Sequence, residues 1–253
     1  MTLNENQILD NWNEFLGYIK KYITGDRKQQ LLDFYSKYEE RFALMPASHK
    51  PQYHNCFPGG YIEHVNRVIR GTIKVNQLWN EFETKSSHTE EEAVFSAINH
   101  DLGKFGSFEH EAALPNPSEW HVKNRGEIYA FNTQLDYMNV PDRSLWILSQ
   151  LGIPVSKNEY LAIKLHDGLY DEANKPYLLS YSAETKLRTS LPYIVHQADL
   201  MAARVEFERE WLDKLNNTPV EEPKVTVKPT PQSKPVQVPE NKDLKNIMDT
   251  FFN

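Results

Sequence analysis

The chain has 253 residues, of which 40% are hydrophobic and 12% aromatic, enough for one large domain or two small ones with a real core. Its formal net charge of −7 at pH 7 argues against broad electrostatic binding to nucleic acid. A local basic patch is still compatible with this net charge. Cys56 is the only cysteine, which excludes a disulfide framework and a cysteine-based zinc site. The polar start of the sequence predicts no signal peptide, and the lack of an 18-residue apolar run predicts no membrane span. We therefore expect a cytoplasmic protein.

Apolar residues recur at spacings of three and four along most of the chain, which is typical of amphipathic helices. Thr89 is a candidate N-cap with Glu92 in the capping-box position, and Gly103 is expected to end that helix. Candidate strands are few and short, so the predicted fold class is all-α. The predicted helices cover residues 8–23, 27–45, 58–79 (after a turn), 89–103, 124–135, 142–151, 157–165 and 191–215.

The composition changes after residue 216, because six of the fifteen prolines fall between positions 219 and 239. Such a proline density forbids a central strand and predicts an extended linker that is partly polyproline. We therefore divide the chain into a domain over 1–215, with its core at 53–206 and N-terminal helices at 3–45, a Pro/Lys/Val-rich linker over 216–240, and a peptide over 241–253.

The end of the chain, "KNIMDTFF", places Met248 three residues before Phe251 and Phe252. This spacing resembles the short peptides that dock replication enzymes onto sliding clamps, with Lys245 where the eukaryotic motif has Gln. Two rings and a methionine on one turn are suitable anchors for a hydrophobic groove. The peptide is expected either to recruit such a partner or to fold back onto its own domain.

"FSAINHDLGKFG" places His100 and Asp101 at the end of an apolar helix, on its inward side. Burying a carboxylate without a partner costs on the order of several kcal/mol of folding free energy. An isolated pair of this kind is most simply a hydrogen-bonded core pair. The pair is not isolated, because His64 lies beside the apolar stripe of one predicted helix and Asp199 lies on the inward side of another. Imidazoles and carboxylates from three helices suit a divalent transition metal, or magnesium completed by water.

The order His64, His100-Asp101 in "HDLGK" and Asp199 in "HQADLMAARVE" resembles the HD-domain metal-dependent phosphohydrolases. The entry "HNCFPGGYIEHVNRV" is similar to that of HD-type exoribonucleases, and "LHDGLYDEANKPY" is similar to segments of phage-encoded HD-domain proteins, which implies the host cytoplasm as the location if a phage encodes the chain. The resemblance covers about residues 53–206 and implies an all-α HD-domain bundle.

The resemblance also implies the ligands. His64, His100, Asp101 and Asp199 would hold one or two divalent ions (Mn, Mg, Fe, Co or Ni), with Asp101 the bridge between two. Family members with two metals add histidines before the last aspartate, and His121 and His166 are the candidates here. The alternatives are an exposed or substrate-facing His121 and a His166 that interacts with a helix dipole.

Lys104, three residues after Asp101, is either a phosphate contact or a lysine that complements the helix dipole. Lys123 and Arg125 are either phosphate contacts or solvated surface residues. The predicted activity is hydrolysis of a phosphoester of a nucleotide or of a single-stranded nucleic acid by metal-activated water, with Asp101 managing the proton and Lys104 stabilising charge. The alternative is an inactive HD-fold adaptor that recruits a replication or transcription partner through the C-terminal peptide.

Overall fold

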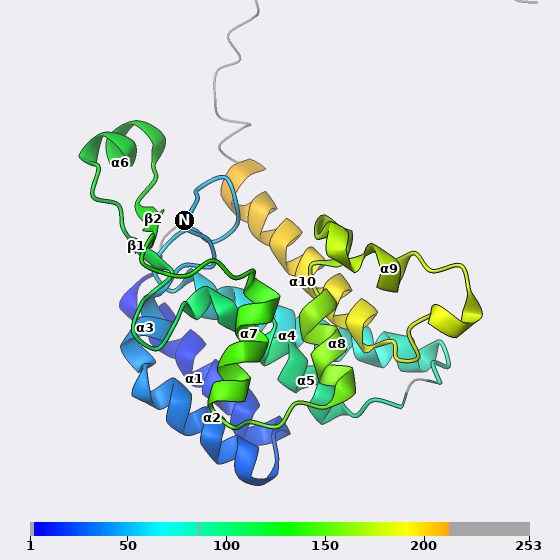
Figure 1. Cartoon of the computed structure of the whole chain (residues 1–253). Coiled ribbons are helices and arrows are strands. Elements are labelled where there is room, and N and C mark those ends of the chain that lie inside the picture. The colour runs from blue at the N-terminus through cyan, green and yellow to red at the C-terminus, as the bar shows by residue number, and fades with distance from the viewer. Residues whose placement is uncertain (1–2, 86, 213–253) are drawn as a thin grey trace, which may run out of the picture. The chain divides into compact units, whose positions relative to one another are not determined.

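The computed structural model describes residues 3–85 and 87–212, all within the first of the two units into which the chain divides, Met1–Asn217. The described part is mostly helical, which confirms the all-α prediction (Figure 1). The predicted linker and the peptide that carries Met248, Phe251 and Phe252 lie outside the described residues. In the described part, no helix is both long enough and apolar enough to cross a membrane.

The main helices follow one another with short connections. They are α1 (Glu5–Tyr22), α2 (Gly25–Lys37), α3 (Glu39–Leu44), α4 (Gly60–Glu81), α5 (Glu90–Asn99), α6 (Glu119–Arg125), α7 (Val140–Gln150), α8 (Lys157–Leu165), α9 (Lys175–Leu178) and α10 (Leu191–Phe207). Single turns intervene at η1 (Leu102–Phe105), η2 (Gly168–Tyr170), η3 (Glu172–Asn174) and η4 (Ala183–Thr185), and a wider turn, η5 (Glu208–Leu212), follows α10.

Helix α4 is the centre of the bundle and packs against α1, α3, α5 and α10, while α8 packs against α5, α7 and α10 (Figure 1). An aromatic cluster closes the side formed by α2, α3 and η1, where the rings of Phe42 and Phe105 stack with centroids 4.8 Å apart. This cluster holds the turn that follows His100 and Asp101 against the N-terminal helices. The positions of both residues therefore depend on the core rather than on a surface loop.

Capping residues explain where several helices begin. The predicted capping box of Thr89 and Glu92 is present at the start of α5, and Ser156 and Glu159 form another at α8. The expected end at Gly103 is wrong, because α5 ends at Asn99 and the chain continues as the η1 turn. Gly103 is instead required by close packing, since a Cβ there would lie 2.2 Å from the carbonyl oxygen of Val140.

Three further helix predictions need correction. The helix expected over 124–135 is absent, because Gly126 ends α6 in the left-handed region and the next segment pairs as a strand. Strands β1 (Ala113–Pro115) and β2 (Tyr129–Phe131) form an antiparallel pair that carries α6 between them. The helix expected over 27–45 is interrupted at Tyr38, and the helix expected over 191–215 keeps α-helical geometry only to Phe207.

Candidate metal centre

The structure brings together His64, His100, Asp101, Asp199 and His166, all of them candidate ligands in the sequence. They come from the second turn of α4, from the end of α5, from α10 and from the end of α8. The three imidazoles are almost completely buried, and Asp199 is the most accessible member of the set. Five side chains from four packed elements thus form one cluster, called the metal cluster below.

Asp101 lies between the three rings. Its Oδ2 atom is 3.5 Å from Nε2 of His64 and 3.4 Å from Nε2 of His100, and its Oδ1 atom is 3.5 Å from Nε2 of His166. Asp199 approaches from the other side, with Oδ1 3.2 Å from Nε2 of His64. Each histidine therefore presents Nε2 to the carboxylate of Asp101, and His64 and His100 also face Asp199.

The other nitrogen of each ring is held in place. Nδ1 of His100 donates to the carbonyl oxygen of Ala97, and Nδ1 of His166 donates to that of Ile163, each at 2.8 Å. Each bond joins a histidine to the backbone three residues earlier, at the last turn of its helix. When Nδ1 carries the proton, a neutral ring has its lone pair on Nε2, which is the atom that faces the carboxylates.

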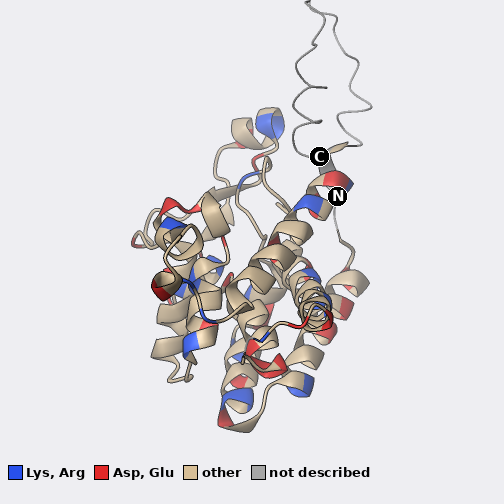
Figure 2. Cartoon of the chain, turned by 90° about the vertical axis from the view of Figure 1, so that its right-hand side faces the viewer, with Lys and Arg blue, Asp and Glu red and all other residues tan. Residues whose placement is uncertain are grey.

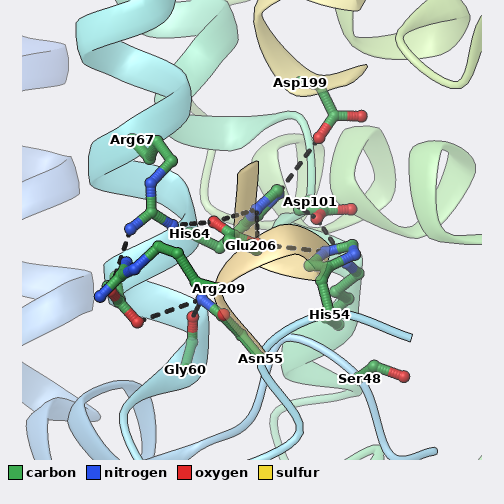
Figure 3. Close-up of polar contacts among 12 residues, drawn as sticks. Ser48, His54, Asn55, Gly60, His64, Arg67, Asp101, Asp199, Glu206 and Arg209 are labelled. Carbon is green, nitrogen blue, oxygen red and sulfur yellow. Dashed lines mark hydrogen bonds and ion pairs between the residues drawn. The ribbon is translucent and has the colours of Figure 1, made fainter. Parts of the chain in front are cut away.

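His64 is oriented differently, by a carboxylate that sequence reasoning missed. Glu206 lies 3.0 Å from Nδ1 of His64 and also pairs with Arg67 (Figure 3). Glu206 is seven residues after Asp199 and therefore lies on the same face of α10, a spacing that could have revealed it. Carboxylates commonly orient metal-binding histidines in this way and make the ring more basic.

The buried histidines and carboxylates of the metal cluster stabilise one another's charged forms, which shifts their pKa values. Burial alone would lower the pKa of His64, but the carboxylate of Glu206, with those of the metal cluster, raises it well above its usual value. Burial likewise opposes the effect of Asp101 on His166, whose pKa is nevertheless raised to about 9. The pKa of Asp101 lies well below its usual value despite burial, because Lys104 and His100 stabilise its charge. The site therefore favours positive charge between its carboxylates.

Two ring nitrogens of the metal cluster are buried without a hydrogen bond to the described part of the chain. Nε2 of His64 and Nε2 of His100 are buried and make no hydrogen bond of acceptable geometry with any described residue. An unsatisfied buried polar atom costs roughly 1–3 kcal/mol, so two in one cluster require an explanation. A divalent cation would accept both lone pairs and neutralise the carboxylates, and the donor set of imidazole nitrogens and carboxylate oxygens fits such an ion.

A cavity of about 360 Å³ opens onto the metal cluster. Lys104 lines it, with Nζ 2.5 Å from Oδ2 of Asp101. Burial lowers the pKa of Lys104, but Asp101 and Asp199 more than offset this effect and raise it above its usual value, so the ammonium stays charged. His54 and Asp167 also line the cavity, and burial, with His64 nearby, lowers the pKa of His54 to about 3.

The structure does not bring the remaining predicted residues to the cluster. His121, Lys123 and Arg125 lie on α6, which projects from the helical body beyond β1 and β2 (Figure 1). Lys123 pairs with Glu119, and the Arg125 guanidinium lies over the ring of Trp120. The placement of His121 as a second-metal ligand is therefore corrected, since among the described residues it belongs to no group able to share an ion.

Comparisons of the chain with protein-family models, with curated proteins and with solved structures found no match.

Proposed function

We propose that the chain is an HD-type, divalent-metal-dependent phosphohydrolase that cleaves a phosphoester of a nucleotide or of a single-stranded nucleic acid. One observation supports it above all. Residues in the order His, His-Asp, Asp, spread over 136 positions from His64 to Asp199, form one buried cluster whose unsatisfied nitrogens face carboxylates. A bound divalent ion would supply Lewis-acid polarisation of a phosphoryl oxygen and a lowered pKa for its water.

The residues around the cavity have separate tasks in this proposal. The three imidazoles and the carboxylates of Asp101 and Asp199 would hold one or two ions of Mn, Fe, Co, Ni or Mg. Lys104, charged and close to Asp101, would contact a phosphate oxygen and stabilise the charge that develops on it.

A proton must also reach the departing alcohol oxygen. Asp167 is the group best placed to handle it, since 41% of its side chain is exposed and it lines the cavity 3.6 Å from Nε2 of His166. The remaining side chains that line the cavity would bind and orient the substrate.

Metal analysis and a substrate screen test the proposal together. The purified chain is loaded with each ion in turn, and its bound metal is measured by mass spectrometry. It is then incubated with nucleoside mono- and triphosphates, cyclic nucleotides and labelled single strands. We expect a stoichiometric metal and hydrolysis of at least one class. The His100→Ala, Asp101→Ala double variant should lose both, and His121→Ala, which removes a histidine outside the cluster, should keep both.

Full metal content and activity in the double variant would contradict the proposal. A wild-type chain that binds no metal under any condition would instead favour the adaptor, with its C-terminal peptide as the recruiting element. A pull-down with residues 241–253 tests the sliding-clamp partner separately, because it does not depend on the metal.

A further inference from the structure

Three hollows meet at the opening of the metal cluster. The central cavity adjoins a hollow of about 370 Å³ along α10, called the α10 hollow, and one of about 540 Å³ beside β1, β2 and the start of α7, called the hairpin hollow. His54 and Asp167 line all three, so they stand at the junction. Each hollow falls in the size range of about 300–1,000 Å³ that is usual for small-molecule sites.

Exposed aromatic side chains mark this junction. Tyr137, 93% exposed, lines the central cavity and the hairpin hollow, and Tyr170, 72% exposed, lines the central cavity and the α10 hollow. Tyr53, 56% exposed, lines both outer hollows. Large rings left this accessible around one opening are available for stacking, the contact that holds unpaired bases in many single-strand binding proteins.

The three hollows contain few cationic side chains that could bind the phosphate groups of a substrate. Among the described residues that line them, the cationic side chains are Lys104, Arg143 and Arg204. Arg143 is buried and donates to the carbonyl oxygens of Gly103 and Asp136, so it is occupied. Along the ribbon in Figure 2, positions of Lys and Arg are interspersed with positions of Asp and Glu. Arg204 lies outside the central cavity, in the α10 hollow, where it donates to the hydroxyl of Tyr170 at 3.4 Å. Lys104 and the metal cluster together therefore define one phosphate position in the central cavity.

We propose that the preferred substrate is a short single-stranded oligonucleotide. Its phosphodiester lies at the metal cluster beside Lys104, and its two flanking nucleosides occupy the α10 hollow and the hairpin hollow, stacked on Tyr170 and Tyr137. This inference rests on the proposed function and narrows its substrate class. Hydrolysis adds water across one P–O bond and yields a phosphomonoester and a free hydroxyl. One phosphate position with an aromatic hollow on each side suits a diester, whereas a triphosphate chain would need further cations.

The test compares tyrosine variants on dinucleotide substrates. Tyr137→Leu and Tyr170→Leu remove a ring at the junction, and Tyr181→Leu removes a tyrosine that is 99% exposed and lies outside all three hollows. Hydrolysis of dinucleotides whose only phosphate is the internal diester, in ribo and deoxy forms, is measured beside a nucleoside monophosphate and a triphosphate. Metal content is measured for every variant.

We expect the dinucleotide to be the best substrate and each junction variant to raise its KM about tenfold, as for the loss of one base–ring stack, with a smaller change in kcat. Tyr181→Leu should match the wild type, Tyr137→Phe and Tyr170→Phe should recover most of the affinity, and metal content should not change. Unchanged KM in both Leu variants, or a preference for mono- or triphosphates, would overturn the inference while leaving phosphohydrolysis intact.

A binding measurement keeps the two proposals distinguishable. If no phosphoester is hydrolysed, the proposed function fails, and a fluorescein-labelled phosphorothioate trinucleotide still tests the inference by anisotropy with metal-loaded protein. Binding that weakens about tenfold in Tyr137→Leu and Tyr170→Leu, but not in Tyr181→Leu, supports the single-strand site. Equal affinity in all four proteins, or no binding to any of them, refutes it.

Discussion

His100 and His121 have similar neighbours in the sequence, where each is close to an acidic residue and to a cation, yet they lie in opposite surroundings. His100 ends a helix whose last seven residues, from Ala93 to Asn99, are all buried. His121 lies on α6, a short helix that is described in full and has no buried residue. Ligand-type residues thus become a candidate site only where packed helices hold them against one another and away from water.

Asp101 should give the largest effect, because it contacts all three imidazoles and Lys104. We expect Asp101→Asn, which keeps the shape of the side chain, to abolish metal binding and reduce hydrolysis to background. In metal-free protein it leaves buried positive charge without compensation and should cost about 3–5 kcal/mol of unfolding free energy. Urea unfolding in chelator measures this. A loss below about 1 kcal/mol would mean that the carboxylate is not integral to the cluster.

Glu206→Gln should have the next largest effect. The amide keeps the volume of the side chain but removes the charge that orients His64. We expect metal affinity to fall about 10- to 100-fold, measured by competition with a chelator of known affinity. Glu63→Gln is the matched control, because the Glu63 carboxylate also pairs with Arg67 but forms no ion pair with the His64 ring. Equal losses in the two variants would show that Arg67, and not the contact with His64, carries the effect.

The stability of metal-free protein should depend on pH through the histidines of the cluster. The pKa of His166 is raised to about 9 in the folded chain, so its contribution is complete below the unfolded value near 6.5 and is lost as the pH rises through 9. We therefore expect Tm in chelator to fall between pH 6.5 and 9.5, and to fall less in His166→Gln. Because a bound ion requires a neutral ring, stabilisation by added metal should grow over the same interval. A flat Tm in chelator would contradict the raised pKa.

The smallest effect is expected on α6. Replacement of His121, Lys123 and Arg125 by alanine should leave metal content unchanged and alter kcat and KM less than about twofold, since exposed charges contribute little. This triple variant is the negative reference for the three changes above. A large rise in KM would place α6 at the substrate, as the sequence interpretation allowed.

Four of the five candidate ligands in the metal cluster could be predicted because each has a signal in its own helix. His64, His100, Asp101 and Asp199 follow apolar periodicity, and the family resemblance supplied their order. His166 and His121 could not be separated by sequence, because both are histidines near charged residues and only the fold decides which helix end is buried. The hairpin of β1 and β2 was missed, since a strand of three residues is too short for periodicity to reveal.

The bonds from His100 to Ala97 and from His166 to Ile163 make two helix ends part of the site. Because the acceptor in each bond is a main-chain oxygen, the bond itself requires no particular side chain at residue 97 or 163, and the limits on those two positions come from their burial in the core. The spacing, in contrast, cannot change. One residue inserted between Ala97 and His100 would turn the imidazole by about 100° around the helix axis and carry it out of the cluster. A substitution at residue 97 or 163 that keeps the volume of the side chain should therefore leave the histidine in place, whereas an insertion in the same turn should displace it.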